Sequence, residues 1–135
     1  MAWGTVLSAT QLVSLSATEK TFNKDAVDWK IGLSPGESAH VMVKAGMGAT
    51  DDVTFNLYGS NIDSPSGGAV VSALASTDWH LITQFTVDNV NDTGEWQGLI
   101  ISGYKWLLVG AVLVGTTDTA STADLKVALD GVSAS

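Results

Sequence analysis

The sequence contains neither cysteine nor arginine among its 135 residues. Without cysteine the chain can form no disulfide, no thiolate nucleophile and no zinc site with cysteine ligands. Six lysines face 14 acidic residues, and the formal net charge at pH 7 is -8. Because affinity for nucleic acid comes from cationic groups that neutralise phosphates, this charge balance argues against a nucleic-acid partner.

A long uninterrupted apolar segment is also missing. The most apolar stretch, Leu99–Gly115, contains Lys105 and is interrupted by Gly103 and Gly110. A membrane-spanning helix needs about 20 predominantly apolar residues, so we expect no transmembrane segment and no membrane as a partner. The stretch instead predicts two buried strands around a turn at residues 102–104. The N-terminus has no positively charged start, so no secretory signal peptide is expected.

Much of the remaining sequence alternates apolar and polar residues with a period of two, the period of a β-strand. Val41, Val43 and Ala45 share one face, and Lys44 points to the other. Such alternation predicts a strand with one face on a core and one face in water. The segments that show it are residues 41–45, 53–58, 79–87 and 125–130.

Two segments carry more specific expectations. In the third of these alternating segments, the predicted core face holds Trp79, Leu81, Phe85 and Val87. The run 106–114 is apolar on both faces, which is typical of a central strand covered on both sides. The second face of this strand is covered either by another part of the same chain or by a second copy of the protein.

Turn residues separate these segments at short intervals, and Pro35 followed by Gly36 predicts a type II turn with a positive φ at the glycine. No segment has a clear helical period, and residues 14–24 are the best candidate for a helical turn. No linker divides the chain. We therefore predict an all-β fold, a single-domain antiparallel β-sandwich or jelly roll of about eight strands. Residues 1–16 form an N-terminal arm or first strand, and residues 17–135 form the sandwich domain.

Residues that could carry chemistry are few. His40 and His80 fall on the outward faces of predicted strands, and no G-x-S-x-G nucleophile motif accompanies them. Asp88, Asp92 and Glu95 lie close in sequence, and oxygen-rich loops of this kind can hold calcium. Their spacing does not match the D-x-[DN]-x-[DN]-G pattern, so a solvated turn is the favoured interpretation. We therefore expect no enzyme, no metal and no cofactor. A small hydrolase on a jelly-roll scaffold is the weaker alternative.

Tryptophan is abundant for a chain of this length. The five are Trp3, Trp29, Trp79, Trp96 and Trp106. Core packing is the first expectation for each, most clearly for Trp79. Exposed tryptophans form contacts between proteins and the platforms of sugar-binding sites. Taken together, the five predict at least one exposed aromatic patch.

Three segments resemble a known family. Residues 33–41 read L-S-P-G-E-S-A-H-V, residues 57–61 read L-Y-G-S-N, and residues 101–110 read I-S-G-Y-K-W-L-L-V-G. In this order they resemble small β-sandwich head decoration (cement) proteins of tailed bacteriophages, and the resemblance spans residues 30–131. Such proteins commonly have an arginine at the position of Leu108, where this chain departs from the pattern.

The resemblance implies a non-enzymatic role in a virion. Such proteins bind the outer surface of an expanded capsid, often as trimers at three-fold positions, and clamp adjacent major capsid subunits. The implied partners are the major capsid protein and further copies of this chain. The implied location is the outer capsid surface, after synthesis in the host cytoplasm, and the absence of cysteine suits folding in that reducing compartment.

Two segments offer apolar residues for such contacts: the N-terminal arm, which can pair with the sheet edge of a neighbour, and the apolar strand 106–114. The candidate interface residues are Trp3, Val6, Leu7, Trp106, Leu108 and Val112. The alternative function is a carbohydrate- or receptor-binding β-sandwich module that uses exposed tryptophans and loop carboxylates. A glycan array separates the two, since specific sugar binding is not expected of a pure cement protein.

Overall fold

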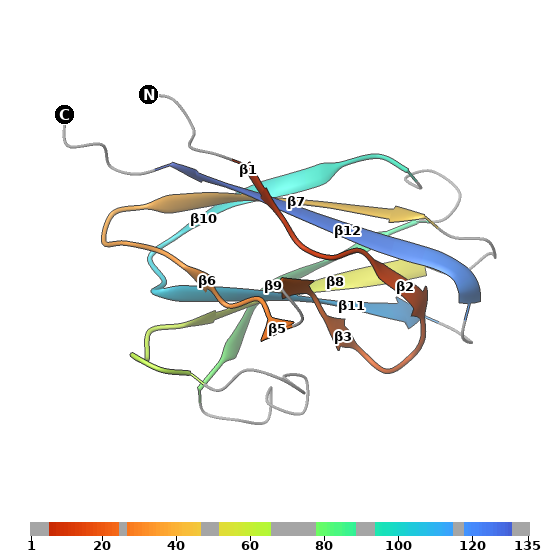
Figure 1. Cartoon of the computed structure of the whole chain (residues 1–135), viewed down its shortest axis with the longest axis horizontal. Helices are drawn as coiled ribbons and strands as arrows, with labels where there is room; N and C mark the ends of the chain where they lie inside the picture. Colours follow the sequence, from red (N-terminus) through yellow and green to blue (C-terminus); the bar gives the residue numbers. More distant parts are fainter. Residues whose placement is uncertain are drawn as a thin grey trace.

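The computed structural model describes residues 6–24, 27–46, 52–65, 78–88, 94–114 and 118–130. These ranges contain strands but no helix, and hence no helix that could span a membrane. The strands are β1 (Val6–Ser8), β2 (Leu12–Leu15), β3 (Lys20–Thr21), β4 (Asn23–Lys24), β5 (Val27–Asp28), β6 (Ile31–Gly32), β7 (Ser38–Gly46), β8 (Asp52–Ser60), β9 (His80–Val87), β10 (Gln97–Ser102), β11 (Trp106–Val114) and β12 (Asp118–Asp130). Two antiparallel sheets of five strands face each other (Figure 1), and β4 pairs with β5 in a small hairpin.

The strand order is that of a jelly roll. The first sheet has the order β1-β12-β7-β10, with β2 also paired to β12; the second has the order β3-β11-β8-β9, with β6 also paired to β11. β1 and β2 therefore act as one interrupted strand, and so do β3 and β6. Counted in this way, the two sheets contain eight strands, and every connection between them except β8 to β9 changes sheets, as in a jelly roll. The predicted single-domain antiparallel β-sandwich is confirmed.

The core lies between the two sheets and is filled by alternate residues of the long strands. Val41 and Val43 of β7 are buried, as the alternation predicts. The ring of Phe55 on β8 stacks on Phe22 with centroids 6.3 Å apart and packs against Phe85 of β9 at 5.8 Å. Alternation places one apolar face of each sheet against the other, which removes the most apolar area from water.

Glycines with positive φ form the turns that the sequence predicts. Gly36 has a φ of 80°, and the Glu37 N–H donates to the Ser34 carbonyl at 2.9 Å, which closes the turn after Pro35. Gly103 has a φ of 88° and ends β10. Residues with a side chain rarely adopt this backbone conformation, so glycine is required at both turns.

Residues 14–24, the best candidate for a helical turn in a sequence without a clear helical period, form no helix, because this segment contributes the end of β2 together with β3 and β4. The apolar stretch 99–115 does contain two strands around a turn, but β10 and β11 belong to different sheets. β10 is an edge strand with alternate residues exposed, so only β11 is buried as predicted.

A β-bulge changes the facing of residues in β9. The register of β9 against β8 shifts between Leu57 and Tyr58. Ile82 consequently packs against the core, and Leu81 is turned to the outer face with 44% of its surface exposed. An extra residue reverses which side chains point inward. The predicted core face is therefore right for Phe85 and Val87 and wrong for Leu81.

The N-terminal segment is part of the first sheet over its described length. β1 pairs with the end of β12, and β2 pairs with its beginning. Between them the Thr10 N–H donates to the Asn23 carbonyl at 2.7 Å, which joins this edge to the β4–β5 hairpin. Of the segment 1–16, residues 1–5 lie outside the described residues.

Candidate functional site

A shallow hollow beside Trp96, termed here the Trp96 hollow, lies on the outer face of the first sheet. Its volume is about 280 Å³. Its lining residues are Ser8, Ala9, Gln11, Lys44, Trp96, Asp124, Leu125 and Lys126. Trp96 lies directly before β10 and is 39% exposed, so it is one exposed aromatic residue where the sequence predicts an exposed aromatic patch.

Two lysine ammonium groups lie over the ring of Trp96. Nζ of Lys44 is 4.9 Å from the ring centroid and Nζ of Lys126 is 4.4 Å from it, both within the about 6 Å range of cation–π contacts. Asp124 Oδ2 is 4.0 Å from the Lys44 ammonium, and Asp124 Oδ1 accepts a hydrogen bond of 2.9 Å from the Gln11 amide. The hollow thus combines an aromatic ring, two cations, a carboxylate and an amide.

A second hollow, termed the end hollow, opens where the β6–β7 turn meets the β10–β11 turn. Its volume is about 270 Å³, and its lining residues are Leu33, Ser34, Pro35, Gly36, Glu37, Asn61, Gly103, Tyr104 and Lys105. The Glu37 carboxylate accepts a hydrogen bond of 2.9 Å from the Ser34 N–H. That carboxylate therefore stabilises its own turn.

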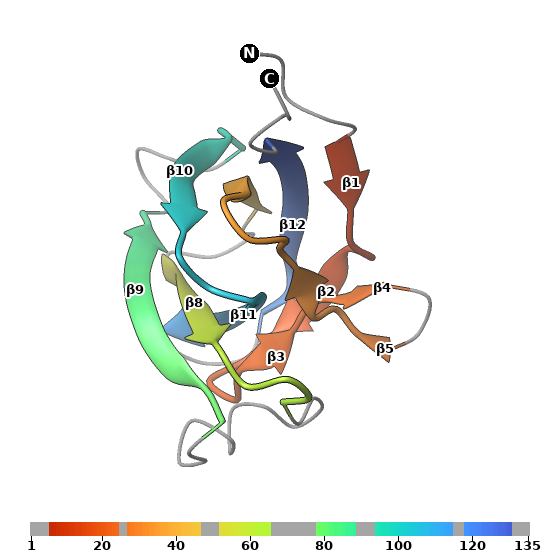
Figure 2. The ribbon, with the colours of Figure 1, turned by 90° about the vertical axis from the view of Figure 1, so that its left-hand side faces the viewer.

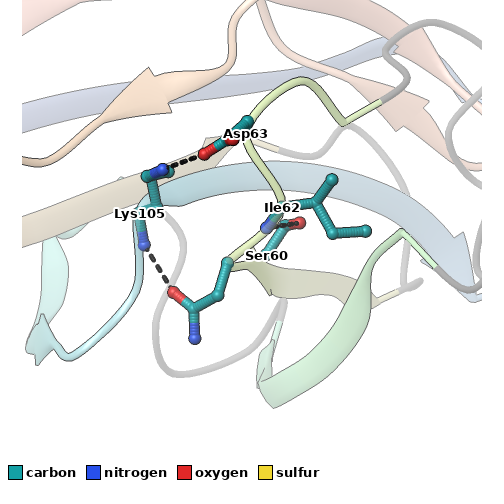
Figure 3. A network of polar contacts seen from close by, with 5 residues as sticks. Ser60, Ile62, Asp63 and Lys105 are labelled. Carbon is teal, nitrogen blue, oxygen red and sulfur yellow. Dashed lines mark hydrogen bonds and ion pairs between the residues drawn. The ribbon is translucent and has the colours of Figure 1, made fainter.

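Lys105 joins the loops around the end hollow (Figure 3). Its backbone N–H donates to the Ser60 carbonyl at 3.1 Å and to Asn61 Oδ1 at 2.8 Å, and its ammonium group pairs with the Asp63 carboxylate. The hydrogen bond from Lys105, together with its positive charge, lowers the pKa of the exposed Asp63 carboxyl group below its ordinary value. Lys105 therefore acts as a structural link between the end of β8 and the start of β11.

The two histidines lie on different sheets. His40 is on β7 of the first sheet, and His80 is on β9 of the second. His80 Nε2 lies 2.9 Å from the Tyr104 hydroxyl, and the two rings are 5.1 Å apart. Tyr104 lies so close to Gly59 that a Cβ there would come within 2.5 Å of the Tyr104 ring. His80 therefore positions Tyr104 at the rim of the end hollow.

The acidic cluster considered for calcium is only partly within the described residues. Asp88 and Glu95 are described, and Asp92 lies outside. Within the described part of the chain, no group of three or more histidine or acidic side chains could hold a metal ion.

The outer face of β11 is partly covered by its own chain. Leu108 forms a second apolar cluster with Tyr58 and Trp79, and Trp106 packs against it. The side chain of Leu108 is 0% exposed, so it offers no surface to a partner, and its assignment as an interface residue is corrected. Trp79 is buried, as predicted, but in this cluster and not between the sheets. Val112 is half-buried on the same outer face.

Exposed apolar side chains occur at the sheet edges. Val6, Ala128, His40 and Ile100 lie directly opposite one another on four neighbouring strands of the first sheet. The two ends of this row, Val6 and Ile100, are 51% and 61% exposed. Leu7 lies opposite the buried Val127 and is itself half-buried.

Val13 on β2 and Leu81 on β9 are two further exposed apolar residues on edge strands. Figure 2 shows β9 and β10 beside each other on one side of the sandwich and β1 on the other. Both sides therefore carry exposed apolar residues on strands whose outer backbone edge has no partner strand among the described residues. Of the other predicted interface residues, Trp106 packs on the second cluster and Trp3 lies outside the described residues.

Comparisons with known proteins identify no family. No protein-family model matches the chain, and no curated protein matches it. A solved structure described as "Bacillus endospore appendages form a novel family of disulfide-linked pili" is similar with a TM-score of 0.45 and 11% identity, over 98% of this chain and 93% of that chain. This chain has no cysteine and can form no disulfide.

Proposed function

We propose that the protein is a non-enzymatic structural protein of a virion, which decorates a bacteriophage capsid and clamps neighbouring major capsid subunits. It acts as a homo-oligomer, a trimer in the arrangement that its family resemblance implies. The single observation that supports this proposal best is the exposed apolar residues on both open sides of the sandwich. These sides are the surfaces through which the protein contacts its sister copies and the capsid.

The edge strands of the two sheets support this role. An exposed edge strand with apolar side chains invites pairing with another chain, and monomeric proteins usually protect such edges with charges, proline or a covering element. Here Val6 and Val13 lie on one edge, and Leu81 and Ile100 on the other side. A protein surrounded by neighbours in a shell buries these residues when it assembles.

The open side between β9 and β10 is also hollowed. The hollow has a volume of about 350 Å³ and is lined by Thr83, Phe85, Gln97, Gly98 and Leu99. Phe85 and Leu99 pack against the core from its margin. A neighbouring chain that covers this side buries core-lining apolar surface as well as the edge residues, and such burial contributes about 25 cal/mol per Å² of apolar area.

Native mass spectrometry and a capsid-binding assay test the proposal together. The variant Val6→Asp/Val13→Asp places charges on the β1–β2 edge, and we expect it to lose oligomers and occupancy on expanded capsids while its unfolding midpoint stays unchanged. The matched control is Ile62→Asp, because Ile62 is exposed but lies in the loop after β8. A wild-type protein that is monomeric at high concentration and does not bind capsids contradicts the proposal.

A further inference from the structure

We infer that the Trp96 hollow binds a saccharide whose sugar residue carries a carboxylate. This site goes beyond the assembly role, because its lining includes none of the exposed apolar residues on the edge strands that support that role. Three features carry the inference: the exposed ring, the polar side chains around it and the sign of the charge.

The Trp96 ring and the polar groups beside it match the apolar face and the polar rim of a sugar. A pyranose ring has an apolar C–H face that packs on an aromatic ring, and hydroxyl groups around its rim that need donors and acceptors. Trp96 supplies the ring, and the Asp124 carboxylate and the Gln11 amide supply an acceptor and a donor that are joined by a hydrogen bond of 2.9 Å. The volume of about 280 Å³ lies at the lower end of small-molecule pockets, which suits one sugar residue of a longer chain.

The charge of the hollow favours an anion. The Lys44 ammonium group forms an ion pair with the Asp124 carboxylate at 4.0 Å. No carboxylate among the described residues lies within ion-pair distance of the Lys126 ammonium group, which is held over the Trp96 ring at 4.4 Å. The hollow therefore carries two cations and one anion on a chain whose net charge is -8. A carboxylate on the ligand completes the pairing.

An acidic peptide is the other anionic ligand, and the strands below the hollow argue against it. An extended peptide is usually recognised through the free backbone groups of an edge strand. Lys44 lies on β7 and Lys126 on β12, and both strands are paired on each side in the first sheet. The two strands that carry these lysines therefore offer a ligand their side chains only, which suits the hydroxyl groups of a saccharide.

The test is a titration of the full-length protein, followed through the indole N–H signal of Trp96 in nuclear magnetic resonance spectra. The probes are tetragalacturonate, a neutral galactose tetrasaccharide and a tetraglutamate peptide. We expect a saturable shift with tetragalacturonate, at least about tenfold weaker binding of the other two, and weaker binding as the salt concentration rises.

Two variants and one control locate the binding. Because Trp96→Ala removes the reporter signal, its binding is measured by calorimetry, and we expect none. Lys126→Gln keeps the ring, and we expect it to weaken tetragalacturonate binding at least about tenfold and to remove the preference over the neutral sugar. Lys105→Gln changes a lysine at the end hollow and leaves binding unchanged. The inference is overturned by the absence of a saturable shift, by equal affinity for the neutral sugar, or by tetraglutamate binding as tightly as tetragalacturonate.

Discussion

The hydroxyl group of Tyr58 lies 2.8 Å and 2.7 Å from the two carboxylate oxygens of Glu19 and donates a hydrogen bond to that carboxylate. Tyr58 is on β8 in the second sheet, and Glu19 directly precedes β3. Between them, Gly110 of β11 leaves the space that the Glu19 side chain occupies, since a Cβ there would come within 2.0 Å of Glu19 Oε2. This contact fixes the β2–β3 connection on the outer face of the second sheet.

Substitution of Gly110 by alanine should therefore displace Glu19. The new methyl group occupies the position of the carboxylate and leaves the buried Tyr58 hydroxyl without its acceptor, at a cost of about 1–3 kcal/mol in the free energy of unfolding. Urea denaturation measures this cost. In a Tyr58→Phe background the hydrogen bonds are already absent, so the same Gly110→Ala change should cost clearly less. Equal losses of stability in the two backgrounds would show that the lost hydrogen bonds between Tyr58 and Glu19 do not cause the destabilisation.

The same pair predicts a loss of stability at high pH. Burial of the Tyr58 hydroxyl, with a further contribution from the hydrogen bond and the negative charge of Glu19, raises the pKa of this group well above its ordinary value. In the unfolded chain a tyrosine loses its proton near pH 10. Above that pH the folded state holds more protons than the unfolded state, so stability is complete below about pH 10 and falls by up to about 1.4 kcal/mol per pH unit above it.

The control for this pH effect is Tyr58→Phe, which has no hydroxyl group at this position. The difference in unfolding free energy between the wild type and Tyr58→Phe should be constant up to about pH 10 and shrink above it. Chemical denaturation between pH 8 and about pH 11.5 measures the difference. A difference that stays constant across this range would contradict a raised pKa of Tyr58.

Residue alternation predicts the sheets well where a strand is regular. It places Val41 and Val43 in the core correctly, because a strand with one side in water has no other way to bury its apolar face. It fails at Leu81, because a single extra residue in β9 reverses the facing and leaves no signal in the sequence. The run 106–114 is apolar on both faces, and on that basis the sequence predicts Leu108 at an interface. In the structure Leu108 is covered by Trp79 from a different part of the chain, a tertiary contact that the sequence does not show.

The Trp96 hollow is partly visible in the sequence. An exposed aromatic residue is expected from the number of tryptophans, and Lys44 is expected on the outer face of its strand. The alternation of Leu125 and Val127 also places Lys126 on an outer face. What the sequence does not provide is the strand order, in which β7 lies between β12 and β10. Only that order brings Lys44, Lys126 and Trp96 together.

Close packing at Gly59 yields a third prediction. A Cβ at this position would lie 2.5 Å from Tyr104 Cδ1 and 2.7 Å from Ile82 Cδ1. Gly59→Ala should therefore push the Tyr104 ring away from His80 and destabilise the protein by about 1–3 kcal/mol, the usual cost of overpacking. Urea denaturation and the His80 ring signals in nuclear magnetic resonance spectra measure the two effects.

The comparison variant for Gly59→Ala is Gly32→Ala. A Cβ at Gly32 would lie 3.1 Å from the ring of Trp106, so a shift of a few tenths of an ångström makes room for it. We expect a smaller loss of stability there than at Gly59, because less overlap has to be relieved. A loss at Gly32 equal to that at Gly59 would mean that ring displacement does not set the cost.

The open side of the sandwich at β9 and β10 gives the last prediction. Leu81 and Ile100 are exposed on these two edge strands, and the double variant Leu81→Lys/Ile100→Lys should change the free energy of unfolding by less than about 1 kcal/mol, since neither side chain is buried in the single chain. Charges on an edge strand disfavour pairing with another chain. The variant should therefore form smaller assemblies than the wild type at the same concentration, as measured by sedimentation velocity. If its assemblies keep their wild-type size, this side of the molecule does not form contacts between copies, and the β1–β2 edge at Val6 alone has to provide them.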